Sequence, residues 1–487
     1  MEPKISKQTS KRTNFIKLTA VYAIMVAAIV LIVALIFMFT LGYRFSSGRI
    51  EQYAFLQFNS SPAGAIVTVD GQAVSSQTPN KASVPAGSHN VVIKRENYQD
   101  WKKTVTIKSA TMNWLNYAIL VPSKLEVEAV SKLESIYASL TSPDKMNMLI
   151  QEKSDKPTFI LANLSSDDFK STKLEIPTKA YSEATTVDVV HSFTPVKWDE
   201  GGRYMLIKHT YGNSSEWLVM DTQDASLTKN ITQIFNIAVD DINFSGTSGN
   251  EFYILSSGDV RKLNLSAGTI SRPFINNVSN FNIYNANIIT YVGVNDNKSK
   301  QVVGIYRDGD ESAHILRQID DKSVSLKIAT TRYFNEDYVV IAENRKIDIL
   351  RGSYPNSVKD TTSLKVTSSI ELKQDVGNLS FSPTGEYVFA QSKENFASYD
   401  LEYQNLSEGA IVGSGELSNL KWLDNDYIWS DRNGDLTIRE FDGANAHTIN
   451  HIMIGQDVAM THNKRYIYSI NKISTGYQLQ RVRMILK

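Results

Sequence analysis

A single uninterrupted apolar segment, from Leu18 to Leu41, constrains this chain more than any other feature of its sequence. No charged residue occurs between Lys17 and Arg44. At about 1.5 Å per residue, a helix of this length reaches roughly 36 Å, which is enough to cross a hydrocarbon core of about 30 Å. We therefore expect one transmembrane helix at 18–41.

The residues around this segment predict its orientation. Five lysines and arginines precede it in residues 1–17, against the single acid Glu2. The positive-inside rule places such a basic tail in the cytoplasm and everything after the helix outside. The run is longer than the apolar core of a cleaved signal peptide, and no small-residue cleavage site follows it. We expect an uncleaved, single-pass signal anchor in the cell membrane.

The overall composition excludes several classes of function. Lys plus Arg and Asp plus Glu number 51 each, and this balance disfavours a nucleic-acid-binding protein. The chain has no cysteine, which excludes disulfides, thiolate metal sites and cysteine nucleophiles. Its 487 residues leave room for two or three domains.

After a polar connector at 42–52, short β-rich stretches separated by turn residues predict a small β-sandwich at 53–121. Asp70-Gly71 is a hairpin signal within it. A type I′ turn needs positive φ at both central positions, and glycine adopts positive φ without steric cost.

This segment resembles the PEGA domain, a small extracytoplasmic β-domain of bacterial and archaeal surface proteins. The matching elements, in order, are Ser61-Pro62-Ala63-Gly64-Ala65, Val67-x-Val69-Asp70-Gly71, Thr78-Pro79, Ala86-Gly87-x-His89-x-Val91 and Tyr98. The sequence departs from the family pattern at Ala63, Gln77 and Asn97, where the family has Glu, Gly and Gly. Together with the preceding anchor, the segment is similar to membrane-anchored PEGA proteins of candidate-phyla bacteria with reduced genomes.

Residues 122–487 contain a weak repeat of hydrophobic strand, polar turn, aromatic residue and second strand. Its clearest copies are at 196–209, 379–392 and 458–471, and weaker copies are at 138–151, 242–257, 281–294, 332–343 and 420–431. Eight copies correspond to about 46 residues each, near the roughly 40–45 residues of a four-stranded propeller blade. We expect a mainly β fold that ends in a β-propeller of eight blades, with seven blades as the alternative.

Two turns in this region resemble the blade turns of TolB-like and WD-repeat propellers. They are Phe381-Ser382-Pro383-Thr384-Gly385 and Trp198-Asp199-Glu200-Gly201-Gly202, although no WD dipeptide ends the repeats. The resemblance implies the architecture only. Because the last copy is one strand short of four, we expect the alternating segment at 125–130 to supply its outer strand and cover the open edge.

A motif search favours a binding protein over an enzyme. The chain has no H-E-x-x-H, no phosphate-binding P-loop and no G-x-S-x-G nucleophile elbow. His447 and His451 have a spacing that suits a metal site on a helix, but they lie in a predicted strand and turn. Asp431-x-Asn433-Gly434-Asp435 is interpreted as a turn, because it lacks the distal bidentate Glu of a calcium loop. We expect no catalytic residue, cofactor or bound metal.

The small domain carries the candidate contact residues. Flat aromatic rings stack on the apolar faces of sugars, and basic residues near an anchor suit lipid headgroups or an anionic wall polymer. The candidate residues are Tyr98, Trp101, Trp114, Lys94, Arg95, Lys102 and Lys103. The competing interpretation is that the aromatic residues belong to the core and the basic residues to a solvated strand.

These observations favour a membrane-anchored, extracytoplasmic binding or scaffold protein of the cell envelope. It would contact surface proteins or wall polymers through its PEGA-like domain and propeller loops. One alternative is a surface hydrolase or lyase with an active site on channel loops. Another is an extracellular sensor, which would need a membrane partner because the short tail holds no output domain.

Overall fold

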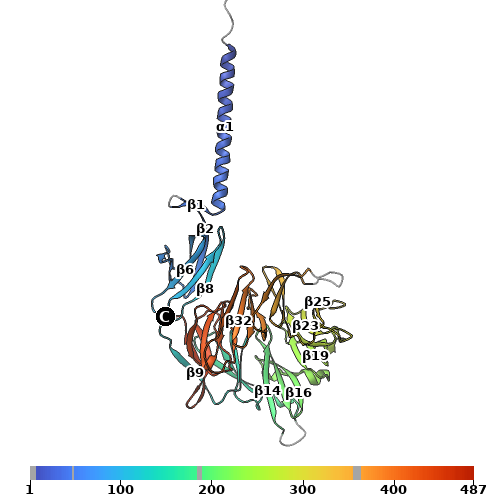
Figure 1. Cartoon of the computed structure of the whole chain (residues 1–487). Coiled ribbons are helices and arrows are strands. Elements are labelled where there is room, and N and C mark those ends of the chain that lie inside the picture. The colour runs from blue at the N-terminus through green and yellow to red at the C-terminus, as the bar shows by residue number, and fades with distance from the viewer. Residues whose placement is uncertain (1–6, 47–48, 184–188, 355–362, 487) are drawn as a thin grey trace, which may run out of the picture. The chain divides into compact units, whose positions relative to one another are not determined.

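The computed structural model describes residues 7–46, 49–183, 189–354 and 363–486. The chain divides into two compact units, Met1–Lys124 and Leu125–Lys487. The first contains the long helix α1 and a small β-sandwich, and the second is built from four-stranded β-sheets (Figure 1).

Helix α1 covers Lys7–Thr40. Its segment Lys17–Thr40 is long and apolar enough to cross a membrane, and none of its most apolar stretch is buried against the rest of the chain. The helix begins before the apolar run, since the Lys- and Arg-containing tail also favours helix. It ends where Gly42 adopts a left-handed φ of 80° and donates its N–H to the Phe39 carbonyl at 3.1 Å.

In the connector expected at 42–52, the described residues form two paired strands. Strand β1, Tyr43–Ser46, pairs antiparallel with the start of β2, Arg49–Ser61. Strand β2 then continues without interruption into the sandwich. The Tyr53 N–H donates to the Gly42 carbonyl at 2.8 Å, so the chain that leaves the helix is hydrogen-bonded to the domain at once.

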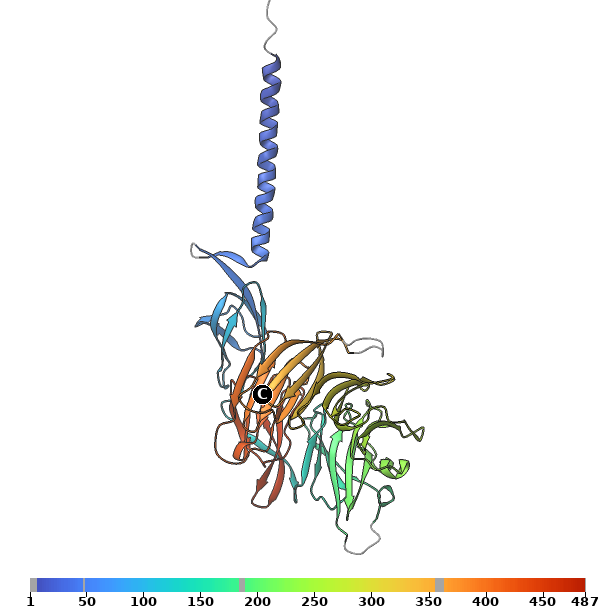
Figure 2. The ribbon, with the colours of Figure 1, turned by 45° about the vertical axis from the view of Figure 1, so that its right-hand side comes forward.

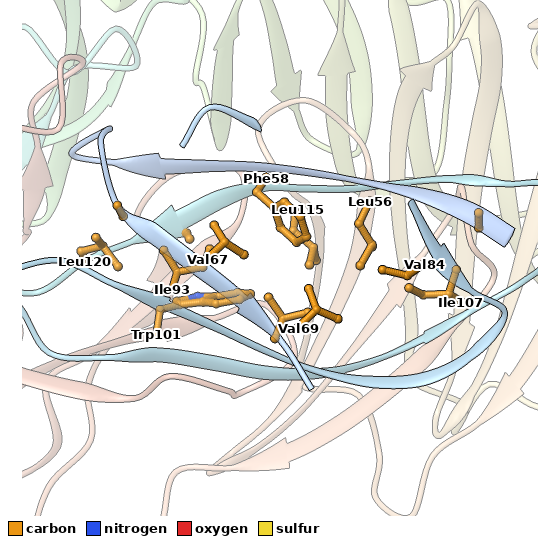
Figure 3. Packing of buried hydrophobic residues seen from close by; sticks show 14 of the residues in the cluster. Leu56, Phe58, Val67, Val69, Val84, Ile93, Trp101, Ile107, Leu115 and Leu120 are labelled. Carbon is orange, nitrogen blue, oxygen red and sulfur yellow. The ribbon is translucent and has the colours of Figure 1, made fainter. Parts of the chain in front are cut away.

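Two four-stranded sheets form the β-sandwich. One contains β1, β2, β5 (Asn80–Pro85) and β8 (Met112–Ile119), with β8 parallel to β2. The other has the order β4 (Gln72–Ala73), β3 (Ile66–Val69), β6 (Gly87–Lys94) and β7 (Trp101–Ile107). Alternate residues of both sheets point inward and form one hydrophobic core, which includes Leu56, Phe58, Val67, Ile93 and Trp101 (Figure 3).

A two-residue turn joins β3 to β4. Val69 pairs with Gln72, and the two residues between them, Asp70 and Gly71, have φ values of 50° and 81°. These are the positive values that a type I′ hairpin turn requires at both positions.

The described part of the second unit contains eight four-stranded sheets. Each of the first four sheets consists of four strands that follow one another in the sequence. The first sheet contains β10 (Ala138–Thr141), β11 (Asn147–Gln151), β12 (Thr158–Asn163) and β13 (Lys170–Glu175), and the second contains β14 (His191–Trp198), β15 (Tyr204–Tyr211), β16 (Ser214–Asp221) and β17 (Lys229–Asn230). The third contains β18 (Asp241–Phe244), β19 (Glu251–Ser256), β20 (Asp259–Asn264) and β21 (Thr269–Ile270), and the fourth contains β22 (Val278–Tyr284), β23 (Ile288–Val294), β24 (Gln301–Arg307) and β25 (His314–Ile319).

The next three sheets contain β26 (Leu326–Tyr333), β27 (Glu336–Glu343), β28 (Lys346–Gly352) and β29 (Lys365–Glu371); β30 (Asn378–Phe381), β31 (Tyr387–Ser392), β32 (Asn395–Asp400) and β33 (Leu406–Ala410); and β34 (Leu420–Trp422), β35 (Tyr427–Ser430), β36 (Asp435–Glu440) and β37 (His447–His451). Short helical segments lie between strands: η1 (Thr178–Ala180), η2 (Ala225–Leu227), α2 (Ile231–Phe235) and η3 (Arg432–Gly434). Such consecutive four-stranded antiparallel sheets are the architecture of a β-propeller.

The eighth sheet combines the two ends of this unit. It has the order β38 (Ala459–Met460), β39 (Tyr466–Ile473), β40 (Gly476–Arg483) and β9 (Val127–Leu133). Its outer strand therefore comes from the start of the unit, and Val127 pairs with Val482. The predicted closure of the open edge is confirmed, although the strand covers Val127–Leu133 rather than the expected 125–130.

Apolar side chains connect neighbouring sheets. One cluster contains Leu133 of β9, Met148 of β11 and Tyr468 of β39, so the first sheet packs directly on the last. Other clusters join successive sheets along the chain, for example β15 and β16 to β18–β20. Figures 1 and 2 show the sheets following one another from green to red, with β9 beside the C-terminal strands. The ring is therefore closed both by the hydrophobic cluster between the first and last sheets and by the pairing of β9 with β40.

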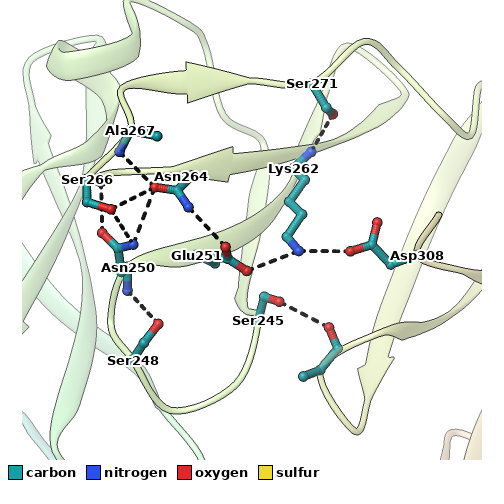
Figure 4. A network of polar contacts seen from close by, with 11 residues as sticks. Ser245, Ser248, Asn250, Glu251, Lys262, Asn264, Ser266, Ala267, Ser271 and Asp308 are labelled. Atoms are coloured by element: carbon teal, nitrogen blue, oxygen red, sulfur yellow. Dashed lines mark hydrogen bonds and ion pairs between the residues drawn. The ribbon is translucent and has the colours of Figure 1, made fainter.

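Polar contacts also cross between sheets. Lys262 on β20 donates to Glu251 on β19 at 3.0 Å and to Asp308, which follows β24, at 2.8 Å (Figure 4). Burial alone would lower the pKa of Lys262, but its hydrogen bonds with Asp308 and Glu251 raise it. This network holds the third and fourth sheets together at their solvent-facing side.

Candidate functional site

Two of the three aromatic residues expected to contact a ligand lie in the core of the sandwich. Trp101 is 1% exposed and its ring meets Tyr117 edge-on, with 6.3 Å between ring centroids. Tyr98 is 8% exposed and packs in the same cluster. Their rings support the sandwich from inside and present no stacking surface to a ligand, as the competing interpretation expected.

The four candidate cations lie near the same β-sheet edge but make local contacts. Lys94 on β6 and Lys102 on β7 approach one carboxylate, that of Asp100, at 2.8 and 3.7 Å. The Arg95 guanidinium lies 5.8 Å from the centroid of the Tyr98 ring. The Lys103 ammonium lies 4.9 Å from the Tyr117 ring, a cation–π distance. The four basic residues thus come from β6, the residue after it and β7, whereas Trp114 is on β8 of the other sheet.

Trp114 belongs to an exposed apolar patch on strands β2 and β8. Phe55, Met112 and Trp114 are 42%, 44% and 43% exposed. Phe55 pairs with Met112, and Gln57 pairs with Trp114, so the three side chains project from adjacent strands on the outward side of the sheet. Leu56, next to Phe55, and Leu115, next to Trp114, point to the opposite side, into the core. We call Phe55, Met112 and Trp114 the outer apolar face.

This face is continuous with the residues that follow helix α1. The Arg44 guanidinium lies 5.4 Å from the Tyr53 ring, 5.9 Å from the Phe55 ring and 6.0 Å from the Phe39 ring at the end of the helix. A Cβ at Gly42 would stand 2.4 Å from the Tyr53 carbonyl oxygen, so only glycine permits this close approach. One cation thus connects the helix end to the outer apolar face.

A cleft of about 590 Å³ lies at the edge of the sandwich, along strands β4 and β5. We call it the β4–β5 cleft. Its polar lining residues are Tyr53, Asp70, Gln72, Ser75, Lys81, Ser83 and His89. The Ser83 hydroxyl is buried and has no hydrogen-bond partner in the described part of the protein. The volume falls within the range of small-molecule binding sites, and its lining offers both donors and acceptors.

Asp70 and His89 form a fixed pair at one side of this cleft. His89 Nδ1 lies 2.7 Å from Asp70 Oδ2, and its Nε2 lies 2.8 Å from the Pro85 carbonyl oxygen. Both partners are acceptors, so both hydrogen bonds form only when both ring nitrogens carry hydrogen. Hydrogen bonds from the Asn90 N–H and then from His89 hold the pKa of Asp70 below its ordinary value. The pair joins the hairpin turn to β6.

The propeller contains a chain of buried ionisable groups that the motif search missed. Glu216 accepts from the Ser182 N–H and hydroxyl, each at 2.7 Å. His209 Nδ1 lies 2.8 Å from Glu216, and its Nε2 lies 2.9 Å from His191 Nδ1. A neutral His209 that donates to Glu216 must accept from His191, which leaves His191 Nε2 as an acceptor. The arrangement orients His191 through two buried groups.

One sequence signal could have found part of this chain. Strands β15 and β16 are joined by the two-residue turn Gly212-Asn213, and in that register His209 pairs with Glu216. The third member, His191, comes from β14, where Phe193 lies opposite His209. Its placement depends on a β-bulge between Pro195 and Lys197, which the sequence does not indicate.

The other motifs have structural roles. His447 and His451 lie four residues apart on β37, which corresponds to about 13 Å along a strand. Burial lowers the pKa of His447. Asp431 is fully buried and accepts from the backbone N–H groups of Ser418, Asn419 and Gly455 at 2.8–3.0 Å. Among the described residues, no group of three or more His, Asp or Glu side chains is placed to hold a metal.

Comparison with known families identifies the sandwich. Residues 55–120 match the model of the PEGA domain. The match runs from Phe55 in β2 to Leu120, just after β8, and it includes the outer apolar face, the Asp70–Gly71 turn and the residues of the β4–β5 cleft other than Tyr53. The chain therefore carries a PEGA domain, as its motifs indicated. No curated protein matches the chain significantly.

Several solved structures, one of them a β-propeller domain, have a low similarity to the chain. The Myceliophteria thermophila Cps50 (Swd1) β-propeller domain has a TM-score of 0.41 at 12% identity and covers 65% of this chain and 97% of its own. Kluyveromyces lactis Hsv2 has a TM-score of 0.38 at 10% identity and covers 72% and 98%. A eukaryotic initiation factor has a TM-score of 0.38 at 14% identity and covers 68% and 93%. The propeller assignment itself rests on the sheet order described above.

Proposed function

We propose that this chain, whose residues 55–120 are a PEGA domain, is a membrane-anchored binding and scaffold protein of the cell envelope. Its basic tail lies in the cytoplasm and the PEGA domain and propeller lie outside, because the cations precede the apolar helix. The ligand is a component of the envelope, either a wall polymer or a surface protein. The propeller presents loops of its blades as a second contact surface.

The observation that carries this proposal is the β4–β5 cleft. It combines the Tyr53 ring with hydroxyl, amide, carboxylate and ammonium groups, and it contains the unpartnered Ser83 hydroxyl. A hydroxyl-rich polymer supplies the donors and acceptors that such a lining satisfies, and an aromatic ring stacks on the apolar face of a sugar. We therefore favour a glycan-containing wall polymer as the ligand of the cleft.

Co-sedimentation of the detergent-purified full-length chain with isolated, insoluble wall polymer tests this proposal. We expect the double variant Lys81→Gln/Ser83→Ala to reduce binding about tenfold, because it removes the ammonium and one hydroxyl from the residues that line the cleft. Lys153→Gln, at an exposed position of the propeller, is the matched control and should bind like the wild type. Equal binding by the cleft variant and the wild type would contradict the cleft as the binding site.

The same assay separates the alternatives. Loss of binding in Lys94→Gln/Lys102→Gln, with the cleft variant unaffected, would assign the polymer to the basic edge of the other sheet. Release of soluble fragments from the polymer would favour the hydrolase or lyase. The oriented His191 is then the group to replace first, because its Nε2 is positioned as a proton acceptor.

A further inference from the structure

The composition of the outer apolar face, and its position near the end of helix α1, indicate what this face contacts. It presents Phe55, Met112 and Trp114 on two paired strands, each more than two-fifths exposed. Single exposed apolar residues are ordinary, but a contiguous group that includes a Trp and a Phe marks an interaction surface. Trp and Tyr rings, with an apolar body and a polar tip, are enriched where membranes meet water.

The covalent geometry places this face close to the end of the membrane span. Helix α1 ends at Thr40, and Gly42, two residues later, accepts a hydrogen bond from the Tyr53 N–H at 2.8 Å. The Ala110 N–H, from the turn before β8, donates to the Tyr53 carbonyl at 3.1 Å. Tyr53 of β2 and the turn before β8 therefore both lie beside Gly42 at the helix end.

Charge supports the same location. The Arg44 guanidinium lies about 6 Å from both the Phe39 and the Phe55 rings, between helix and sheet. Lys108 is exposed in the turn before β8. Glu51 lies opposite Arg44 in the strand register, and Arg49 begins β2, so Arg44, Arg49 and Lys108 exceed the acidic residue Glu51 by two positive charges. Cations with aromatic residues at this level suit lipid phosphates and the glycerol region.

We infer that the outer apolar face rests on the lipid headgroups of the outer leaflet, so that the PEGA domain is docked on the membrane surface. The inference rests on the proposed membrane anchor and goes beyond it by assigning a second, interfacial contact. From Tyr53 to Gln57, which pairs with Trp114, β2 advances about 13 Å, more than the depth of one headgroup layer. The contact therefore requires β2 and β8 to lie along the surface.

This orientation has a functional consequence for the β4–β5 cleft. Strand β5 is the edge strand beside β2, and β4 lies at the edge of the second sheet, whereas β8 pairs with the opposite side of β2. Ser83 pairs with Phe55 and Lys81 pairs with Gln57, so these two cleft residues project from the same side of the sheet as the outer apolar face. The other cleft residues Asp70, Gln72 and His89 come from the turn and strands of the second sheet, and this side of the cleft stays accessible to the polymer. The membrane contact would hold the cleft at a defined height above the lipid.

Tryptophan quenching by lipid tests the inference. The full-length chain is reconstituted in vesicles of phosphatidylcholine and phosphatidylglycerol, with or without a lipid that carries a spin label at its headgroup. The chain has six Trp residues, so the contribution of Trp114 is the difference between the wild type and Trp114→Phe. We expect Trp114→Phe to abolish most of the headgroup-dependent quenching. Trp429→Phe, which removes a Trp of the propeller core, should leave that quenching unchanged.

The outcomes separate this inference from the proposed function. Equal headgroup-dependent quenching of the wild type and Trp114→Phe, in a chain that floats with the vesicles, would overturn the docked orientation and leave the anchor intact. A chain that does not float with vesicles would contradict the anchor itself. A double variant, Phe55→Ser/Met112→Ser, keeps Trp114 and should halve its quenching or more, because the apolar contact is reduced while the fluorophore remains.

Discussion

Arg481 and Glu128, separated by 353 positions in the chain, form a bidentate ion pair across the seam of the propeller. The seam is the place where β9, from the start of the unit, pairs with β40, from its end. Arg481 Nε lies 2.8 Å from Glu128 Oε2, and Arg481 Nη2 lies 3.0 Å from Oε1. Arg481 is buried, also donates to the Asp167 carbonyl at 2.9 Å, and lies 4.3 Å from the Tyr466 ring. Its hydrogen bond lowers the pKa of Glu128. One side chain thus joins the first and last strands of the ring.

Replacing Arg481 should destabilise the propeller. Arg481→Ala removes charge-assisted hydrogen bonds and the packing of the guanidinium on Tyr466, and we expect a loss of about 2–4 kcal/mol. Denaturant unfolding of the full-length chain in detergent measures this change. The control Arg465→Ala removes the exposed pair with Asp167 and should cost less than about 1 kcal/mol. Similar losses of unfolding free energy in the two variants would show that the Arg481–Glu128 pair stabilises the propeller no more than an exposed ion pair does.

Deleting the seam strand should cause aggregation. Removal of 127–133 leaves the outer edge of β40 without its ladder of hydrogen bonds, and unpaired edges associate with other chains. Light scattering on heating should show earlier aggregation than in the wild type. Deletion of the exposed turn 296–298, also within the propeller, controls for chain shortening. A monomeric deletion variant with an unchanged melting temperature would contradict the closure.

The two glycines at sharp turns should respond differently to alanine. At Gly71 an added Cβ meets no atom within 4 Å, so Gly71→Ala introduces only the strain of positive φ, about 1 kcal/mol. At Gly42 the Cβ would also stand 2.4 Å from the Tyr53 carbonyl oxygen, so Gly42→Ala must move β2 and cost more. Thermal unfolding monitored at the PEGA domain compares them. The reverse order would refute the tight helix-to-sheet connection.

Glu216 should make the propeller less stable at acid pH. Burial alone would raise its pKa, but hydrogen bonds from His209 and Ser182 hold the pKa at about 2, below the ordinary value of 4.5. A lowered pKa means that the carboxylate stabilises the fold above about pH 4.5 and that this contribution is lost as the pH falls toward 2. Denaturant unfolding at several pH values should show that the free energy of unfolding falls less at acid pH in Glu216→Gln than in the wild type. The exposed Glu183→Gln should retain the wild-type pH profile.

The proposed topology predicts which part an external protease reaches. Protease added to intact cells should cleave the propeller and leave the basic tail protected, because the cations at 4–17 hold the tail inside. Antibodies against each end follow the fragments on a blot. Permeabilised cells are the control in which both ends become accessible. Protection of the propeller in intact cells would reverse the orientation.

Much of the architecture could be predicted from local sequence. The apolar run at 18–41 predicts a membrane-length helix, since hydropathy and length alone set that property. The Asp70-Gly71 pair indicates its turn because few residues adopt positive φ. The repeat of strand, turn, aromatic residue and strand indicates four-stranded units, and the missing last strand indicated where 125–130 had to pair.

The site was less predictable, because the face that a strand residue occupies depends on its neighbours in space. Trp101 and Trp114 are both aromatic residues on strands of one small domain, yet the first is core and the second is exposed. The difference arises from the register of β7 and β8 in two different sheets. A one-residue shift of β7 would turn Trp101 outward, and a one-residue shift of β8 would turn Trp114 into the core.

The sequence by itself determined the membrane-length apolar helix, the PEGA turn and the repeating β-units, because each depends on local hydropathy, backbone freedom or periodicity. Only the tertiary structure decided that Arg44 connects Phe39 to Phe55, that Gly42 locks the helix end to β2, and that His191, His209 and Glu216 meet. These contacts join residues on separate strands, and strand pairing and bulges set their distances rather than spacing along the chain.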